Sequence, residues 1–153
     1  MCNETGKAAV IDPAWNGELI ARTIADSGWE LSAIWLTHAH FDHVGGLAEM
    51  LTDGQSLDLG ELRLTVLYTP GHAPGHICLY LPDHDVLFDG DVLFQQSIGR
   101  TDLPGGDSGL LISSIRERLL TLPDKTIVLS GHGSSTTIGE ERQNNPFLTG
   151  LNN

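Results

Sequence analysis

The sequence predicts an α+β fold, because strand-like segments surround one early helix and further helices follow near the end of the chain. The clearest strand spans residues 62–68, where leucine and valine alternate with polar side chains. The clearest helix starts near residue 108, where Leu111, Ile115 and Leu119 recur at intervals of four residues. These observations fit an α+β sandwich.

The first third of the chain predicts two short strands around one surface helix. Residues 8–11 are apolar and end at Asp12, because Pro13 cannot continue a strand ladder. Asn16 can cap a helix that Gly28 ends, and residues 31–36 predict a second buried strand. The remaining predicted elements are a very short helix over 47–51, strands over 56–59, 62–68, 77–81, 86–88 and 125–129, and helices from Asp107 or Ser108 to Leu120 and over 138–145.

Length and composition limit the classes of protein to be considered. The 153 residues are enough for one domain, expected over 1–153, and the net charge of -12 with eight Lys and Arg argues against a nucleic-acid partner. Two distant cysteines, Cys2 and Cys78, favour a reducing compartment. No apolar run is long enough to span a bilayer and no secretory signal is evident, so we expect a cytoplasmic protein without a membrane partner.

A histidine-rich run follows the predicted strand 31–36. Within residues 37–43, Thr-His-Ala-His-Phe-Asp-His, three imidazoles and one carboxylate are typical donors to zinc and similar ions. Side chains two apart on extended chain point the same way, so His38 and His40 can share one ion while Asp42 and His43 face another. This spacing favours two metals, and the alternatives are a histidine-rich tract that binds metal adventitiously and a solvated turn.

Three later positions repeat the pattern of a donor just after a strand and beside glycine. They are His72 after Gly71, Asp91 after Gly90, and His132 between Gly131 and Gly133. The full order, H-x-H-x-D-H followed by His, Asp and His, resembles the metallo-β-lactamase superfamily. Its small glyoxalase II-like (hydroxyacylglutathione hydrolase-like) branch is the most similar, on residues 99–106 (GRTDLPGG), 131–133 (GHG), 136–141 (TTIGEE) and 145–148 (NPFL). The resemblance covers nearly the whole chain.

The resemblance implies an αββα sandwich of two mixed sheets and a dinuclear metallohydrolase. It assigns His38, His40 and His72 to one ion, Asp42, His43 and His132 to the other, and Asp91 to a bridging position. Zinc is expected, with iron or manganese as alternatives, and a hydroxide shared by the ions would attack the substrate carbonyl. Asp42 and Asp91 then have catalytic roles. The resemblance places Asp12 beneath the metal-binding loop, with simple turn formation as the alternative.

The substrate implied by the resemblance is a small-molecule thioester such as S-lactoylglutathione. Arg100 lies in a predicted loop near the Asp91 strand end, where it could bind a substrate carboxylate or instead brace the loop through Asp102. Two other functions stay open: a mononuclear iron persulfide dioxygenase and a non-catalytic metal-binding protein. Metal content and oxygen consumption would distinguish them.

The sequence also departs from the family pattern. Relatives carry an earlier strand pair, and they insert a helix, a strand and a loop between the positions of Met50 and Leu51. The fold is therefore expected to be abbreviated at both places, and the alternative is that residues are missing there from the given sequence. Among the remaining polar residues, His76 is expected to be a spare polar residue, with a hydrogen bond to a metal ligand as the alternative. His84 is expected to be solvated and Cys78 to be a small buried core residue.

Overall fold

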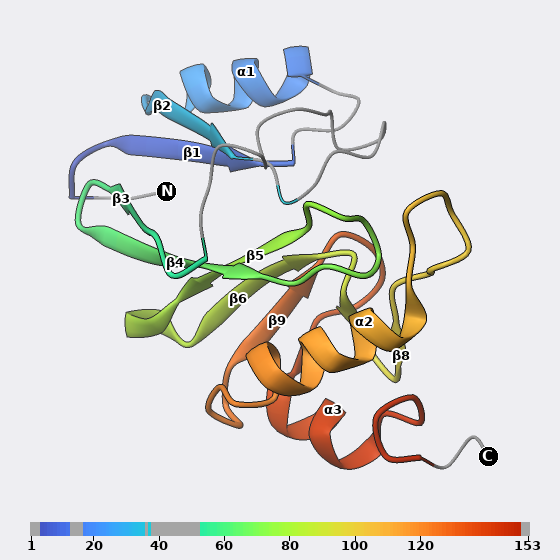
Figure 1. Cartoon of the computed structure of the whole chain (residues 1–153). Coiled ribbons are helices and arrows are strands. Elements are labelled where there is room, and N and C mark those ends of the chain that lie inside the picture. Colours follow the sequence, from blue (N-terminus) through green and yellow to red (C-terminus); the bar gives the residue numbers. More distant parts are fainter. Residues whose placement is uncertain (1–3, 13–16, 36, 38–52, 151–153) are drawn as a thin grey trace.

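The chain folds into four layers of helix, sheet, sheet and helix (Figure 1). This computed structural model describes residues 4–12, 17–35, 37 and 53–150. Helix α1 (Gly17–Asp26) covers a parallel pair formed by β1 (Lys7–Ile11) and β2 (Glu30–Trp35). A six-stranded sheet lies beneath this pair, and helices α2 (Ser108–Ser114) and α3 (Ile138–Asn144) cover its far side. The predicted αββα sandwich is confirmed.

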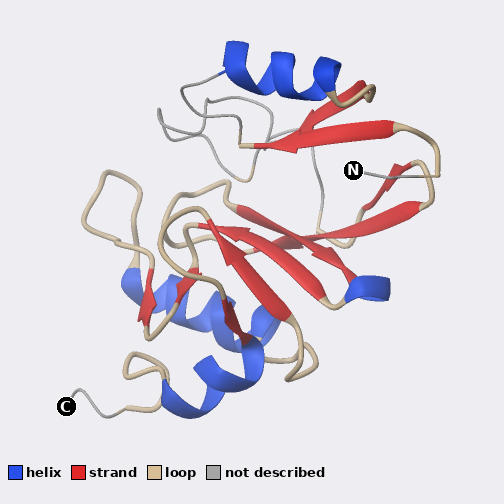
Figure 2. Cartoon of the chain, turned by 180° about the vertical axis from the view of Figure 1, so that it is seen from behind, coloured by secondary structure: helices blue, strands red, loops and turns tan. Residues whose placement is uncertain are grey.

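The large sheet is mixed and has the order β10-β9-β6-β5-β4-β3. Figure 2 shows the strands as red arrows from behind. All neighbours are antiparallel except β6 and β9, which run in the same direction. The strands are β3 (Ser56–Leu59), β4 (Leu62–Tyr68), β5 (Ile77–Leu81), β6 (Val86–Gly90), β9 (Ile127–Ser130) and β10 (Thr136–Thr137), and β7 (Leu93–Phe94) pairs separately with β8 (Ser97–Ile98).

Two apolar clusters hold the layers together on opposite faces of the large sheet. On the helix side, the predicted stripe Leu111, Ile115 and Leu119 is fully buried against strand residues such as Leu87 and Val128. The Asp107 carboxylate accepts a hydrogen bond of 2.9 Å from Leu110 N and so caps α2, which continues as the π-helical turn η3 (Ile115–Leu119). The other cluster, on the β1–β2 side, contains Leu64, Val66, Ile77, Leu79 and Leu81.

The structure corrects one prediction about the first layer. Strand β2 forms where expected, but it is not buried: Leu31 is 42% exposed and Ile34 is 48% exposed. The reason is that β2 belongs to a two-stranded sheet with α1 above it, so much of the strand still faces solvent. The predicted helix over 47–51 and the Asn16 cap lie outside the described residues. In the part of the chain that the structure describes, no helix combines the length and hydropathy of a bilayer span.

A buried carboxylate, Glu141 of α3, connects this helix to the loop after β7. It accepts hydrogen bonds from Gln96 N at 2.8 Å, Thr136 Oγ1 at 2.6 Å and Asn145 Nδ2 at 2.8 Å. Its side chain is fully buried. Removing it would leave three donors without their acceptor in a place that water does not reach.

We therefore predict that Glu141→Ala lowers the free energy of unfolding by about 2 kcal/mol or more, since each buried donor left unsatisfied costs roughly 1–3 kcal/mol. The exposed neighbour Glu140 provides the matched control, and Glu140→Ala should change stability much less. Urea denaturation of both variants measures the difference. Similar losses in the two variants would contradict the structural role of Glu141.

Candidate metal centre

The candidate site lies at one edge of the large sheet, where the parallel strands β6 and β9 end. Side chains that follow neighbouring parallel strands meet at the same edge of a sheet. Asp91 follows β6, and His132 comes shortly after β9. A hydrogen bond of 2.7 Å from Gly131 N to Gly90 O ties the two strand ends together.

One carboxylate oxygen of Asp91 faces two imidazole nitrogens. Asp91 Oδ2 lies 3.6 Å from His72 Nε2 and 3.5 Å from His132 Nε2. These distances are too long for hydrogen bonds. Two donor atoms that each lie about 2.1 Å from a tetrahedral ion are separated by about 3.4 Å, so both spacings suit a shared metal ligand.

The tautomer of His72 also suits metal binding. Its Nδ1 lies 2.7 Å from the carbonyl oxygen of Arg100, and a carbonyl oxygen can only accept. Nδ1 is therefore the protonated nitrogen of the neutral ring, and Nε2 is the nitrogen that faces Asp91 Oδ2. Fixing a ligand histidine through a backbone carbonyl is a common arrangement around metal ions. No sequence pattern predicts this contact, because it joins residues 28 positions apart.

The two histidines differ in exposure, which gives the site an open side. His72 and Asp91 are buried, whereas the His132 side chain is 64% exposed. Burial of charged or polar donors is unfavourable unless they are paired or bind a metal. Of these three described residues, His132 is the one most accessible to solvent.

Asp12 contacts Thr37, the first residue of the histidine-rich run. Its Oδ1 accepts from Thr37 N at 2.8 Å, and its Oδ2 accepts from Thr37 Oγ1 at 2.7 Å. Thr37 is fully buried, and its carbonyl oxygen accepts from Ile77 N at 2.7 Å. The residue directly before His38 is thus fixed by three hydrogen bonds.

The structure brings together only part of the predicted ligand set. Asp91 Oδ2 lies close to both His72 and His132. The other four predicted ligands lie outside the described residues: His38, His40, Asp42 and His43. Within residues 4–12, 17–35, 37 and 53–150, no group of three or more His, Cys, Asp or Glu forms a metal-binding cluster by itself. The donor types and spacings of the three described residues fit a metal ion that takes its other ligands from elsewhere.

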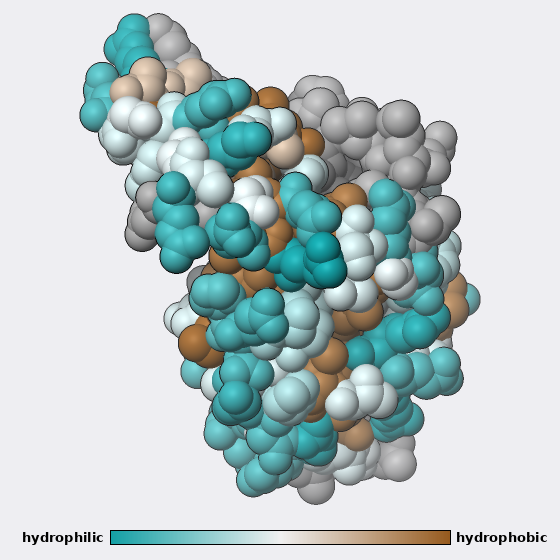
Figure 3. Space-filling view, turned by 90° about the vertical axis from the view of Figure 1, so that its left-hand side faces the viewer, coloured by the Kyte–Doolittle hydropathy of each residue, from teal (hydrophilic) through white to brown (hydrophobic). Residues whose placement is uncertain are grey.

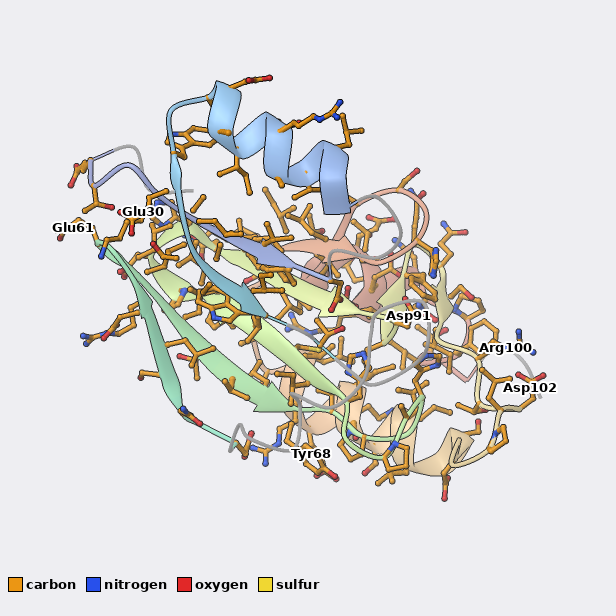
Figure 4. All side chains as sticks on the ribbon, turned by 90° about the horizontal axis from the view of Figure 1, so that it is seen from above. Glu30, Glu61, Tyr68, Asp91, Arg100 and Asp102 are labelled. Atoms are coloured by element: carbon orange, nitrogen blue, oxygen red, sulfur yellow. The ribbon has the colours of Figure 1, made fainter. Side chains whose placement is uncertain are left out.

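Arg100 pairs with Asp102, which is the second of the two roles expected for it from the sequence. Its Nε and Nη2 donate to Asp102 Oδ1 and Oδ2, each at 2.7 Å, and both side chains are exposed at the rim of the molecule (Figure 4). Binding of a substrate carboxylate by Arg100 stays a prediction, and it would require exchange of the Asp102 partner. The hydrogen bonds from Arg100 lower the pKa of Asp102 from 3.8 to about 2.

Two other polar residues near the site have surroundings that the sequence did not reveal. His76 was expected to be a spare polar residue, and that expectation is wrong: it is fully buried, and both ring nitrogens have partners. Asp89 is also fully buried, accepting from Leu93 N at 2.7 Å. Burial raises the pKa of the Asp89 carboxyl well above its ordinary value, and the charge of Asp91 adds to the effect. His84 is exposed and Cys78 is buried, as predicted.

An apolar cavity of about 970 Å³ separates the β1–β2 layer from the large sheet and reaches the candidate site. Its apolar walls include Ile11, Ile20, Leu64 and Leu81, and its polar end includes Asp12, Thr37 and His132. Figure 3 shows apolar side chains in a hollow between the upper and lower parts of the molecule. The inner faces of the two sheets are therefore incompletely packed against each other.

Comparison with known proteins identifies the family. A family model described as the metallo-beta-lactamase superfamily matches residues 2–53 and 49–132. A probable metallo-hydrolase of Bacillus subtilis, YqgX, is 39% identical over 93% of this chain and 87% of its own length. The hydroxyacylglutathione hydrolase GloC of Haemophilus influenzae is 36% identical over 92% of this chain and 87% of its own length. The chain belongs to the metallo-beta-lactamase superfamily, and its relatives include glyoxalase II-like proteins.

Solved structures agree with this assignment. BLEG-1, a B3 metallo-beta-lactamase, superposes with a TM-score of 0.88 at 38% identity and covers 97% of this chain and 92% of its own. ETHE1 from Myxococcus xanthus gives 0.87 at 29% identity, covering 97% and 77%. TTHA1623 in a di-iron-bound form gives 0.80 at 36% identity, covering 90% and 88%. Proteins of this fold bind divalent metals.

The relatives also carry residues that this chain lacks. The alignment with the Bacillus subtilis protein runs over 184 residues, more than the 153 of the whole chain. The two segments that match the family model meet at residues 49–53. Both findings agree with the predicted insertion of the relatives between Met50 and Leu51.

A titration of Asp102 tests directly whether the Arg100 guanidinium is hydrogen-bonded to Asp102 in solution. Because the hydrogen bonds from Arg100 are the largest cause of the lowered Asp102 pKa, Arg100→Gln should raise that pKa from about 2 toward 3.8. Carboxyl-carbon NMR across an acid titration measures it. The pair contributes to stability above the unfolded-state pKa, and that contribution is lost as the pH falls toward 2.

The control is the exposed pair of Arg63 and Asp58, which lies on the β3–β4 hairpin. Arg63→Gln should leave the pKa of Asp102 unchanged. If Arg100→Gln also leaves it unchanged, the guanidinium is not held by Asp102 in solution and is available to a substrate carboxylate.

Proposed function

We propose that the chain is a dinuclear metal-dependent hydrolase of thioesters such as S-lactoylglutathione. The observation that carries the proposal is the position of Asp91 Oδ2, nearly equidistant from His72 Nε2 and His132 Nε2. A carboxylate oxygen between two imidazoles suits a ligand shared by two ions. In this proposal His38, His40 and His72 hold one ion, Asp42, His43 and His132 hold the other, and Asp91 belongs to both.

The residues of the chain prepare the site for hydrolysis in three ways. His72 donates its Nδ1 proton to the Arg100 carbonyl, which holds the ring with its Nε2 toward Asp91 Oδ2. Asp91 supplies negative charge from a buried position, where its interaction with cations is strong. Asp12 fixes Thr37, and with it the start of the run that contains the other proposed ligands.

A pair of divalent ions, when bound, supplies a water that is deprotonated near neutral pH and an electrophile for the substrate carbonyl. A thioester releases a thiolate, which is a good leaving group and needs no strong general acid. The named activity of the Haemophilus influenzae relative, hydroxyacylglutathione hydrolysis, supports this substrate class. Zinc is the proposed metal, and the di-iron-bound structural neighbour supports iron as the alternative.

A second candidate is favoured by the similarity to ETHE1, a persulfide dioxygenase. That reaction would use one iron and consume oxygen, whereas thioester hydrolysis would use two ions and consume none. The two candidates therefore differ in metal stoichiometry and in co-substrate.

The test is to purify the protein without added metal, measure its metal content, and assay three substrates. We expect about two metal equivalents, hydrolysis of S-lactoylglutathione, and loss of activity on chelation with recovery on metal addition. One iron equivalent with oxygen uptake on a glutathione persulfide would favour the dioxygenase. A chromogenic β-lactam is the third substrate, and its preferential hydrolysis would contradict the thioester proposal.

The proposal makes a ranked prediction for two aspartates. Asp91→Asn should reduce thioester turnover more than Asp12→Asn, because the first removes a charge shared by both ions and the second changes only a supporting contact. Asn at position 12 retains one acceptor for Thr37 instead of two, and loss of such support typically costs 10–100-fold in activity.

Turnover must be measured at matched metal content, so that poor loading is not mistaken for poor catalysis. Asp58→Asn, at an exposed position of β3, is the control and should keep full activity. Equal losses from Asp91→Asn and Asp12→Asn would show that one of the two roles has been misassigned.

A further inference from the structure

His76 occupies a buried position beside the candidate metal centre. It lies directly before β5, is fully buried, and its ring stands edge-on to His72 with a centroid distance of 6.0 Å and an interplanar angle of 79°. Its Nδ1 lies 3.1 Å from Thr69 Oγ1, and its Nε2 lies 3.3 Å from the backbone nitrogen of Asp91. The ring therefore links the end of β4 to the end of β6.

The hydrogen bond to Asp91 fixes the tautomer of His76. A backbone N–H can only donate, so His76 Nε2 must accept and cannot carry a proton. The neutral ring then carries its proton on Nδ1 and donates to Thr69 Oγ1. The Thr69 hydroxyl is left to donate toward Cys78 Sγ, which lies 3.2 Å away. Donors and acceptors match along this whole chain of contacts.

The backbone next to Asp91 leaves little freedom around this contact. Gly90 has a φ of +56°, in the left-handed region that favours glycine. A Cβ atom placed on Gly90 would lie 2.8 Å from His76 Nε2 and 2.5 Å from Thr37 Oγ1. The imidazole thus packs directly against the Gly90–Asp91 segment, and a small shift of the ring would shift the backbone that carries the Asp91 carboxylate.

We propose that His76 is a positioning residue: its Nε2 holds the Asp91 backbone so that Oδ2 points between His72 Nε2 and His132 Nε2. Three contacts of the same aspartate support this role. The main chain of Asp91 is held by His76 at 3.3 Å, and its side chain faces His72 at 3.6 Å and His132 at 3.5 Å. The proposal rests on the metal centre proposed above, but its tests do not require turnover.

The first test is the ring itself. Nitrogen-15 NMR of histidine-labelled protein at neutral pH should show His76 as a neutral ring with its proton on Nδ1 and an unprotonated, hydrogen-bonded Nε2. His76→Gln identifies the resonance by its disappearance. A proton on Nε2, or a charged ring, would overturn the proposal, because neither form can accept from Asp91 N.

The second test uses two variants, each of which keeps only one of the two hydrogen bonds of His76. In His76→Gln the side-chain carbonyl can reach the position of Nε2 and still accept from Asp91 N. In His76→Asn the shorter amide reaches only the position of Nδ1, so it keeps the Thr69 contact and loses the Asp91 contact. We expect His76→Asn to release bound zinc to a chelator at least 10-fold faster than His76→Gln.

A merely structural histidine would give a different pattern, in which chelation rate follows thermal stability. Thr69→Val separates the two cases, because it removes the Nδ1 partner but leaves the contact between Nε2 and Asp91. This variant should lower the melting temperature while retaining metal as His76→Gln does. Equal zinc release from the Gln and Asn variants would overturn the positioning role.

The thioester assay keeps this inference distinct from the proposed function. If both proposals hold, His76→Asn lowers kcat with little change in KM, since the change concerns a ligand of the reacting centre and not substrate binding. If no thioester is cleaved but the tautomer and the zinc-release pattern are as expected, the proposed substrate is wrong and the role of His76 stands.

Discussion

The architecture of the site depends on one buried residue, Thr37, and on the carboxylate that holds it. Asp12, at the end of β1, accepts from both the N–H and the hydroxyl of Thr37, while the Thr37 carbonyl accepts from Ile77 at the start of β5. These bonds connect the two-stranded layer to the six-stranded sheet at the edge that carries the candidate metal centre. An apolar cavity lies between these two layers, so they make fewer apolar contacts than a fully packed interior would. The hydrogen bonds of Thr37 therefore contribute a larger part of the interaction that joins the layers.

Buried and half-buried carboxylates accumulate around this edge, and the surroundings of each one differ. Asp12 is satisfied by two donors from Thr37. Asp89 accepts from Leu93 N, and burial raises its pKa, which favours the uncharged form. Asp91 faces two imidazoles at distances that suit metal ligands rather than hydrogen bonds. In a chain with a net charge of -12, such a concentration of carboxylates is electrostatically unfavourable without cations, and bound metal ions would be the largest local charges.

Local pattern predicted most of the fold and the donor types of the site, but not the contacts that orient the donors. Strands β4 and β5 begin and end where the sequence placed them, because alternation and flanking glycine or proline are local signals. The exposure of β2 was missed, since it depends on which elements cover the strand. The same limit applies to the site: His72 is fixed by a carbonyl 28 residues away, and His76 binds the backbone of a residue 15 positions away. No spacing rule encodes such long-range contacts with main-chain atoms.

The difference between this chain and its longer relatives falls near residues 49–53, and the described part of the site does not take its geometry from there. His72 is oriented by the Arg100 carbonyl, Asp91 by the ring of His76, and the loop of His132 by the bond between Gly131 and Gly90. All of these contacts lie within residues 72–132. A change in chain length near residues 49–53 therefore alters what surrounds the centre, including the apolar cavity, before it alters the spacing of these three donors. The surroundings of the centre are accordingly where this chain should differ most from its relatives, and the relative placement of His72, Asp91 and His132 is where it should differ least.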